Sequence, residues 1–309
     1  MPIPRFHHTD FADPARLAAL KASRAETISV CIPTLDEAAT IGAIVSGIKK
    51  SLVDEVSLVD EILVIDSGST DGTLDVAAAA GAAALLSSDI APAFGTFTGK
   101  GENLWKALHV AKGGIICYID GDIVNFHEGF VTGLIGPLLA DDGIGYVKAY
   151  YERPLVGEDG SHGSGGGRVS EILIRPLLSL FYPELTGLFQ PLAGEYAARR
   201  ELLEALPFPT GYGVEIAHLL DLVAAGKGSQ LAQTDLVKRI HRNRPDHELG
   251  SMAFEILRVF LDRLQRDGKL SLTSPLPGVF RTWEFNGDSP CEMNSIHEDP
   301  ERPPIGSLV

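Results

Sequence analysis

Apolar segments of strand length alternate with segments of helix length along most of this chain, and this alternation constrains the fold more than any other feature. In the first half, the strand-like runs are residues 27–33, 61–66, 83–86 and 114–120. Helix-like segments separate them, and Ser69 is the expected cap of a helix that begins near Asp71. Such alternation is typical of a mainly parallel sheet. We therefore expect an α/β fold, with a Rossmann-like sheet and helices on both faces.

The second half continues this pattern less regularly. Helices are expected at residues 130–139, 168–180 and 214–224, and strands at 146–151, 192–197 and 231–240. A later helix carries Phe254, Leu257, Leu261 and Leu264 on one face. Glycines crowd residues 157–167, which form either a surface linker or a backbone that lies against a ligand. The expected regions are a helical lead-in at 1–26, two halves at 27–150 and 151–270, and a tail at 271–309 that is loose after residue 286.

Charge and composition exclude several classes of protein. The formal net charge of −15 disfavours nucleic acid and anionic membrane surfaces as partners. No apolar stretch approaches the roughly 20 residues that span a bilayer, and the N-terminus lacks a secretion signal pattern. The 3 cysteines have no spacing typical of disulfides or zinc sites. We therefore expect a cytoplasmic protein, and small anionic substrates stay possible because they need only a few local cations.

Two carboxylates follow the apolar run that ends at residue 119. Asp120 and Asp122 are separated by Gly121 alone. In an open α/β sheet, ligands bind outside the carboxyl ends of the strands, so both acids should face a cleft. Paired hard oxygen ligands suit Mg²⁺ or Mn²⁺ that also holds a diphosphate. The alternative interpretation is an ordinary Asp-Gly turn.

Short polar groups follow two further strands of the first half. Residues 34–37 come after the first strand, and Ser67 comes after the second. Three neighbouring strand ends of this kind predict a nucleotide-sized pocket. No G-x-G-x-x-G follows the first strand, and the glycines around Lys100 do not have P-loop spacing. Lys100 is either a cation for a diphosphate or a solvated lysine at a helix start.

Three residues of the second half have an open interpretation. His241 lies in the polar cluster 238–244 and is either a metal ligand or a surface residue. Arg168 follows the glycines and either binds a phosphate or carboxylate or is an exposed structural arginine. Glu215 begins an apolar helix, where the helix dipole alone could account for an acid.

Taken in order, eight short motifs resemble one family. The segments 32–37, 66–71, 100–102 and 120–122 look like the donor half of a GT-A glycosyltransferase. The segments Gly-Gly-Gly-Arg-Val-Ser-Glu at 165–171, 190–196, 211–215 and 241–245 are similar to glucosyl-3-phosphoglycerate synthases and the related mannosyl-3-phosphoglycerate synthases. The resemblance covers about residues 27–250. It departs from the family at Asp36, Gly121 and Ser170, where Asn, Ser and Thr are frequent.

The resemblance implies a GT-A fold and a retaining, metal-dependent transfer of a hexose from a nucleotide diphosphate sugar to the 2-hydroxyl of 3-phosphoglycerate. Residues 27–150 would bind the nucleotide sugar and residues 151–270 the acceptor. UDP-glucose is the favoured donor and GDP-mannose the alternative. The donor would contact Pro33, Thr34, Leu35, Glu37, Ser67, Lys100, Asp120 and Gly121. The metal, Mg²⁺ or Mn²⁺, would be bound by Asp122 and His241, and the acceptor by Gly167, Arg168, Ser170 and Asn243.

Glu215 and the backbone at Leu192 would lie near the reacting sugar, with Asp122 as the third catalytic residue. Two retaining mechanisms are open: the departing phosphate takes the acceptor proton, which we favour, or Glu215 acts as a nucleophile. The relatives imply a homodimer. Two rival functions are a transferase for polyprenyl phosphate, for which no membrane anchor is visible, and a nucleotide-sugar binder without turnover.

Overall fold

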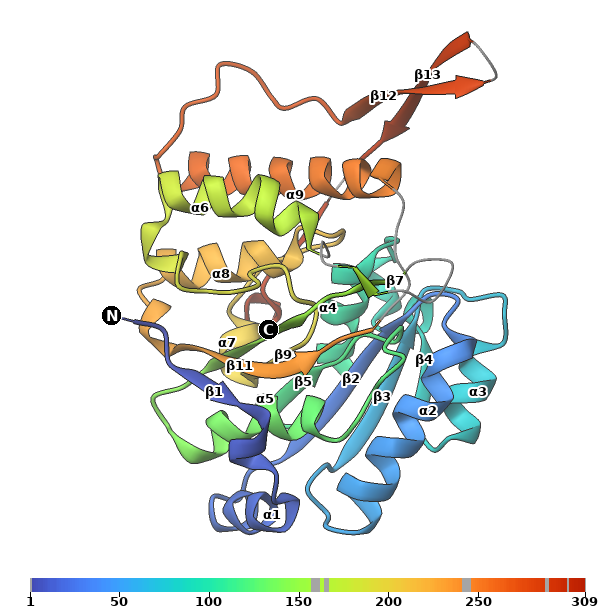
Figure 1. Cartoon of the computed structure of the whole chain (residues 1–309), viewed down its shortest axis with the longest axis vertical. Coiled ribbons are helices and arrows are strands. Elements are labelled where there is room, and N and C mark those ends of the chain that lie inside the picture. The colour runs from blue at the N-terminus through green and yellow to red at the C-terminus, as the bar shows by residue number, and fades with distance from the viewer. Residues whose placement is uncertain are drawn as a thin grey trace.

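One eight-stranded sheet forms the centre of the computed structural model (Figure 1). The structure describes residues 2–156, 162–163, 167–240, 246–286, 289–298 and 300–308. The strand order in the sheet is β1-β11-β6-β9-β5-β2-β3-β4. All neighbours pair in parallel except β9, which is antiparallel to both β5 and β6. The predicted mainly parallel α/β architecture is therefore confirmed.

The strands and helices have the following bounds. The strands of the main sheet are β1 (Arg5–His7), β2 (Ile28–Thr34), β3 (Glu61–Asp66), β4 (Ala83–Leu86), β5 (Ile115–Tyr118), β6 (Tyr146–Glu152), β9 (Tyr196–Arg199) and β11 (Leu231–Lys238). Three two-stranded pairs are formed by β7 (Leu155–Val156) with β8 (His162–Gly163), β10 (Phe208–Pro209) with β14 (Glu301–Arg302), and β12 (Val279–Asn286) with β13 (Ser289–Ile296). The α-helices are α1 (Pro14–Ser23), α2 (Ala38–Ile48), α3 (Thr73–Ala79), α4 (Lys100–Val110), α5 (Gly129–Ala140), α6 (Arg175–Phe181), α7 (Arg200–Glu204), α8 (Val214–Ala224) and α9 (Asp246–Arg266). Short 3₁₀ and π turns are η1 (His8–Phe11), η2 (Lys49–Asp54), η3 (Ser87–Asp89), η4 (Pro92–Phe94), η5 (Ser170–Ile174), η6 (Pro183–Leu185), η7 (Gly228–Gln230) and η8 (Ile305–Ser307).

Two hydrophobic cores lie on opposite faces of the sheet because successive strand residues point to opposite sides. In β2, Cys31 belongs to the core covered by α4, α6, α8 and α9. Its neighbours Val30 and Ile32 belong to the core covered by α1, α2, α3 and α5. All three side chains are fully buried. Strands covered on both faces read as continuous apolar runs, which is why they were visible in the sequence.

Four sequence predictions about local structure need correction. The lead-in is not only helical, because Arg5–His7 adds β1 to the edge of the sheet beside β11. Helix α3 has Gly72 at its N-cap, whereas the hydroxyl of Ser69 donates to Asp66. The strand expected at 192–197 is observed at Tyr196–Arg199 and runs against its neighbours. The tail is not loose throughout, because β14 pairs with β10 and Arg302 is buried.

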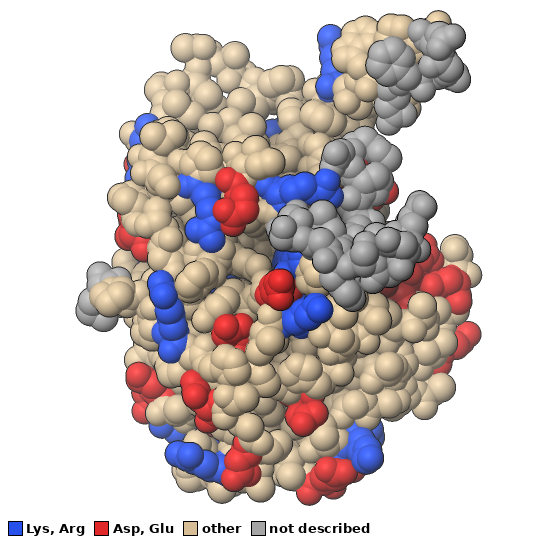
Figure 2. Space-filling model, in the orientation of Figure 1, with Lys and Arg blue, Asp and Glu red and all other residues tan. Residues whose placement is uncertain are grey.

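The charges on the surface of the described residues are mixed in sign on the face that Figure 2 shows. On the face shown in Figure 2, Lys and Arg side chains are interspersed with Asp and Glu side chains, and the residues described there form no continuous basic patch. Within the described ranges, no helix combines the length and the apolar character that crossing a bilayer requires.

Candidate active site at the carboxyl edge of the sheet

One lysine and two acidic side chains from different parts of the chain meet where β5 ends. The ammonium Nζ of Lys100 lies 2.6 Å from Oδ1 of Asp120 and 2.8 Å from Oε1 of Glu215. Asp120 follows β5, Lys100 is the first residue of α4, and Glu215 lies in the first turn of α8. The structure therefore brings together three residues that the sequence placed in one site. Lys100 is not a solvated lysine, because 17% of its side chain is exposed and two carboxylates hold it.

The backbone at Gly194 lies directly against this ion pair. A Cβ atom at Gly194 would be 2.2 Å from Oδ2 of Asp120 and 2.3 Å from Nζ of Lys100, so a side chain there would displace the ion pair. Glycine therefore lets this loop approach Lys100 and Asp120 while the pair stays in place. Leu192, whose backbone was expected near the reacting sugar, is two residues earlier in the same loop and packs partly buried against the core on the α8 face.

A buried arginine joins the two carboxylates of the Asp-Gly-Asp motif. Nη2 of Arg239 lies 3.0 Å from Oδ2 of Asp120 and 2.5 Å from Oδ1 of Asp122. Arg239 follows β11 and is only 3% exposed. A planar guanidinium can bridge two carboxylates in a fixed geometry, so it sets the orientation of both acids.

A second set of contacts holds Arg239 from behind. Its Nε lies 2.7 Å from Oε1 of the fully buried Glu195, and the hydroxyl of Tyr151 donates to the other oxygen of Glu195. Arg153 in turn donates to the Tyr151 hydroxyl at 2.9 Å. Sequence reasoning missed these four residues. The available signals were the polar cluster at 238–244, which contains Arg239, and the motif at 190–196, which contains Glu195.

The ion pairs fix the charge of the central groups. Burial by itself raises the pKa of Asp120, but Lys100 and Arg239 outweigh burial and hold that pKa below its usual range. Burial lowers the pKa of Lys100, but Asp120 and Glu215 outweigh it and raise the pKa above the usual value. Lys100 is therefore protonated and Asp120 ionised at every pH at which such a protein works.

The loops after β2 and β3 are tied to each other through Asp66. Its Oδ2 accepts from the hydroxyl of Thr34 at 2.8 Å, and its Oδ1 accepts from the backbone N–H groups of Gly68 and Ser69. The side-chain amide of Asn103, in α4, donates to Oγ of Ser67 at 2.8 Å. The predicted donor residues Thr34 and Ser67 therefore belong to one rigid edge of the sheet.

The remaining predicted donor residues line the same edge. Pro33 precedes Thr34 in β2, Leu35 is 51% exposed, and Glu37 is the N-cap residue of α2. The carbonyl of Gly121 accepts from the hydroxyl of Thr40 at 2.6 Å. A Cβ at Gly121 would lie 2.9 Å from Cγ2 of Thr34, so the Asp-Gly-Asp segment is in direct contact with the end of β2.

The predicted acceptor residues are only partly described. Gly167, with φ +82°, and Arg168 precede η5, and Ser170 is its first residue and is buried. Asn243 and the predicted metal ligand His241 lie in 241–245, outside the described residues. The acceptor set and the pairing of Asp122 with His241 therefore stay predictions.

The donor groups at the β5 end fit a hard divalent cation. Asp122 is 28% exposed through its side chain, so a carboxylate is presented at the surface of the cluster. Among the described residues, no group of three His, Cys, Asp or Glu side chains could by itself hold a metal ion. Carboxylate oxygens and diphosphate oxygens from a substrate are the ligand types that Mg²⁺ and Mn²⁺ prefer.

Lys148 is a buried amine behind the cluster. It lies in β6, is 1% exposed, and its Nζ has no hydrogen-bond partner among the described residues. The ring of Tyr196 is 4.9 Å away. Burial lowers the pKa of Lys148 to about 7, although the nearby Glu215 carboxylate acts in the opposite direction.

We expect Lys148→Met to stabilise the protein near neutral pH. The pKa in the unfolded chain is near 10.5, so the folded protein carries an unfavourable buried charge below pH ~7 and loses this penalty as the pH rises toward ~10. The variant should melt about 5 °C higher at pH ~7, and the difference should shrink toward pH ~10. Calorimetry across this range checks it, with the exposed Lys112→Met as control. A variant that melts lower than the wild type at pH ~7 would contradict the expectation.

Comparisons with known proteins agree with this geometry. Residues 29–200 match the family described as glycosyl transferase family 2. A glucosyl-3-phosphoglycerate synthase of Petrotoga mobilis is 51% identical to this chain over 271 residues, which are 88% of this chain and 83% of that protein.

Two solved structures resemble the whole chain. One is the glucosyl-3-phosphoglycerate synthase from Mycobacterium tuberculosis in complex with Mn²⁺, uridine diphosphate and glucosyl-3-phosphoglycerate, with a TM-score of 0.86 and 38% identity over 100% of both chains. The other is the mannosyl-3-phosphoglycerate synthase from Rubrobacter xylanophilus, with a TM-score of 0.91 and 35% identity over 99% of this chain and 97% of that chain. The chain therefore belongs to glycosyl transferase family 2, and within it to the family of glucosyl-3-phosphoglycerate and mannosyl-3-phosphoglycerate synthases.

Proposed function

We propose that this protein transfers glucose from UDP-glucose to the 2-hydroxyl of 3-phosphoglycerate, with retention at the anomeric carbon and with Mg²⁺ or Mn²⁺ as cofactor. The observation that carries the proposal is the cluster of Lys100 with Asp120 and Glu215 at the carboxyl edge of the sheet. The 51% identical relative is a glucosyl-3-phosphoglycerate synthase, and the mycobacterial relative binds uridine diphosphate, Mn²⁺ and the glucosylated product.

Breaking the bond between the sugar and the diphosphate leaves negative charge on the departing phosphate. Lys100 begins α4 and is held as an ammonium, so it can stabilise that charge as it develops. Asp122, together with His241, would hold the divalent cation, which supplies further stabilisation of the diphosphate when it is bound. Arg239 fixes the direction of Asp122.

The acceptor has to lose the proton of its 2-hydroxyl. We propose that an oxygen of the departing phosphate takes this proton, so that the protein needs only to place the acceptor on the same face of the sugar. Gly167, Arg168, Ser170 and Asn243 are the residues proposed to hold the phosphate and carboxylate of the acceptor. The backbone at Leu192 would border the sugar.

We expect Glu215→Gln to keep measurable transfer, at about 1–10% of the wild-type kcat. The amide oxygen of Gln can still accept from Lys100, as Oε1 of Glu215 does at 2.8 Å, whereas a nucleophilic role would require the carboxylate. Steady-state kinetics measure the rate of transfer, and mass spectrometry of the intact protein detects a covalently bound glucosyl group. The exposed Glu201→Gln is the control. A glucosyl group trapped on Glu215 would contradict the proposed mechanism.

One assay tests the function. The purified protein is incubated with Mg²⁺, 3-phosphoglycerate and either UDP-glucose or GDP-mannose, and the product is followed by mass and by NMR of the anomeric carbon. We expect an α-linked product with UDP-glucose. The TM-score of 0.91 with the mannosyl-3-phosphoglycerate synthase makes GDP-mannose the second candidate donor. Nucleotide binding without product in either arm would overturn the proposed activity.

We also infer that two copies of this chain form a dimer through the β12–β13 ribbon, which projects away from the rest of the chain (Figure 1). The pairing places Val279 opposite Ile296, with Trp283 four residues further along the strand and on the same face as Val279. Their exposed fractions are 39%, 73% and 66%. An isolated two-stranded ribbon is marginally stable in water, and large exposed apolar side chains favour burial against a second copy.

We expect the wild type to have the mass of a dimer by light scattering, and Trp283→Ser with Ile296→Ser to shift it to the monomer with an unchanged circular dichroism spectrum. A monomeric wild type at micromolar concentration would contradict the dimer.

A cytoplasmic location completes the proposal, and the three cysteines, none of which is in a disulfide, agree with a reducing compartment.

A further inference from the structure

The C-terminal strand β14 is joined to the helix that carries Lys100. The pairing of β14 with β10 places Arg302 opposite Phe208, and the N–H of Thr210 donates to the carbonyl of Pro300 at 3.0 Å. The carbonyl of Thr210 accepts from the N–H of Glu102, in the first turn of α4, at 3.1 Å. A continuous set of contacts therefore runs from the C-terminal segment to the start of α4.

Two glycines beside Lys100 make this contact possible. A Cβ at Gly99 would lie 2.3 Å from the carbonyl oxygen of Thr210, and a Cβ at Gly101 would lie 1.8 Å from that of Pro209. Because neither clash could be relieved without moving backbone, these glycines allow α4 to begin directly against β10. The position of Lys100 is thus set by β10, the strand that pairs with β14.

Arg302 connects β14 to α4 a second time, through its side chain. It is 5% exposed, and its guanidinium makes two hydrogen bonds of 2.7 Å to the fully buried carboxylate of Glu102. Its Nη1 and Nη2 also donate to the carbonyls of Phe94 and Gly95 at 2.7 and 3.1 Å. The guanidinium lies 4.4 Å from the ring centroid of Phe97. A lysine has no planar fork and could not make this set of contacts.

Further contacts join α4 to this loop and to the segment after β14. The ammonium of Lys106, in α4, donates to the carbonyls of Ile90 and Gly95. The ring N–H of Trp105, also in α4, donates to the carbonyl of Pro303 at 3.0 Å. The loop needs such support, because Ala91 holds a φ of 44°, which is unfavourable for a residue with a side chain.

This loop forms one wall of the predicted donor site. Residues Thr96, Phe97 and Thr98 line a cavity of about 100 Å³ together with Asp66 and Ser67. Ser67 is a predicted donor contact, and Lys100 follows the loop directly. The side chain of Arg302 therefore supports both the wall of this cavity and the start of α4.

We propose that Arg302 is a positioning residue for the nucleotide-sugar donor, so that the C-terminal segment is part of the donor site although it touches no substrate. The proposal rests on the proposed function for its donor, UDP-glucose. Arg302 holds residues 91–99 in their conformation and keeps Lys100 in its position. Loss of the Arg302 side chain should leave the acceptor residues unaffected.

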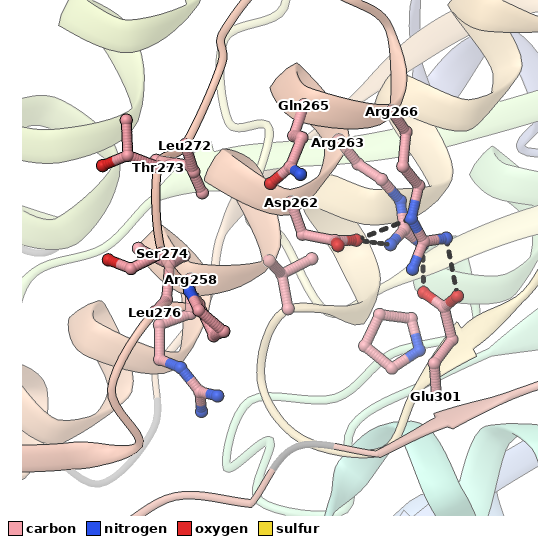
Figure 3. A pocket seen from close by; sticks show the side chains of 13 residues that line it. Arg258, Asp262, Arg263, Gln265, Arg266, Leu272, Thr273, Ser274, Leu276 and Glu301 are labelled. Atoms are coloured by element: carbon pink, nitrogen blue, oxygen red, sulfur yellow. Dashed lines mark hydrogen bonds and ion pairs between the residues drawn. The ribbon is translucent and has the colours of Figure 1, made fainter.

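The opposite side of β14 provides a matched control. Glu301, the neighbour of Arg302, points away from α4 and pairs with Arg263 and Arg266 of α9 at 2.5 and 2.7 Å (Figure 3). These groups border a separate cavity of about 550 Å³ beside residues 272–276. Arg266→Ala removes an ion pair of the same strand while the contacts of Arg302 with Glu102 stay intact.

The experiment measures donor and acceptor separately. We expect Arg302→Ala to raise the KM for UDP-glucose and the Kd for UDP by calorimetry at least tenfold, while the KM for 3-phosphoglycerate changes less than twofold. Arg302→Lys, which keeps the charge, should restore part of the donor affinity. Arg266→Ala should have the wild-type KM for both the donor and the acceptor. If Arg302→Ala fails to fold, Arg302→Lys is compared with the wild type by the same measurements and should raise the donor KM alone.

Hydrogen exchange separates this proposal from the proposed function. The amides of residues 93–102 should exchange faster in either Arg302 variant than in the wild type and in Arg266→Ala, whether or not the protein turns over UDP-glucose. Absence of product in the wild type would overturn the proposed function alone. Unchanged exchange at 93–102, or an unchanged Kd for UDP in folded variants of a wild type that binds UDP, would overturn the role of Arg302.

Discussion

Replacing Asp122 with alanine is expected to lower kcat/KM for transfer by about 10³-fold, a loss of about 4 kcal/mol of transition-state stabilisation. Asp122 is the proposed protein carboxylate for the divalent cation, and Arg239 orients it through a 2.5 Å contact. Removal of the carboxylate should weaken Mn²⁺ binding, which titration followed by electron paramagnetic resonance measures without turnover. The melting temperature should fall only slightly, because Arg239 keeps Asp120 and Glu195 as partners.

Asp142→Ala is the matched control for Asp122→Ala. This acid is exposed on the surface and pairs with Arg24 and Arg199, away from the strand end. It should leave both Mn²⁺ binding and transfer unchanged. Wild-type Mn²⁺ affinity in Asp122→Ala would show that another group holds the cation and would remove the proposed role of Asp122.

The second large effect is expected at Lys100. Lys100→Met should lower kcat by about 10²–10³-fold, because a preorganised cation would no longer face the departing phosphate. It should also destabilise the fold, since Asp120 and Glu215 would keep their buried carboxylates without the ammonium that both of them contact. Kinetics at saturating donor and thermal unfolding measure the two consequences.

The pH dependence of unfolding gives a sharper test of the same variant. Without the ammonium, the pKa of Asp120 in the folded variant should lie above that in the folded wild type, because the lowering effect of Lys100 is lost while burial and Arg239 remain. The folded variant would then bind more protons than the folded wild type, so its loss of stability should grow as the pH rises. The loss in melting temperature relative to the wild type should thus be larger at pH ~7 than at pH ~5. The exposed Lys112→Met should show no such trend, and equal losses at both pH values would contradict the expectation.

The elements that the sequence predicted well are those whose signal is local. The runs at 61–66 and 83–86 are β3 and β4 with the same bounds, and 214–224 is α8. Each carries its own apolar pattern, because a strand or helix that is covered by the core must be apolar on the covered side. The antiparallel direction of β9 has no such local signal, because it depends on where the chain returns to the sheet.

The candidate site shows the same division. Asp120 could be named because it follows a predicted strand, and Lys100 because it lies among glycines at a predicted helix start; their contact at 2.6 Å is observed. Arg239 and Glu195 could not be assigned, because charged residues are ordinarily exposed and their burial appears only when distant segments pack together. The buried Arg302 was hidden for the same reason in a stretch whose composition is typical of a loose tail.

The reversed strand β9 has a consequence for how the two halves depend on each other. Tyr196, its first residue, pairs with Tyr118, the last residue of β5, so the loop that enters β9 arrives at the edge where β5 leaves. Gly194 reaches Lys100 and Asp120 by this route. A fragment that stopped at residue 150 would strip β5 of a partner along its whole length and separate it from β6. A chimera that exchanges one half between relatives must therefore keep β9 together with the first half. Strand β9 completes a cooperative unit with β5, although the two strands are far apart in the sequence.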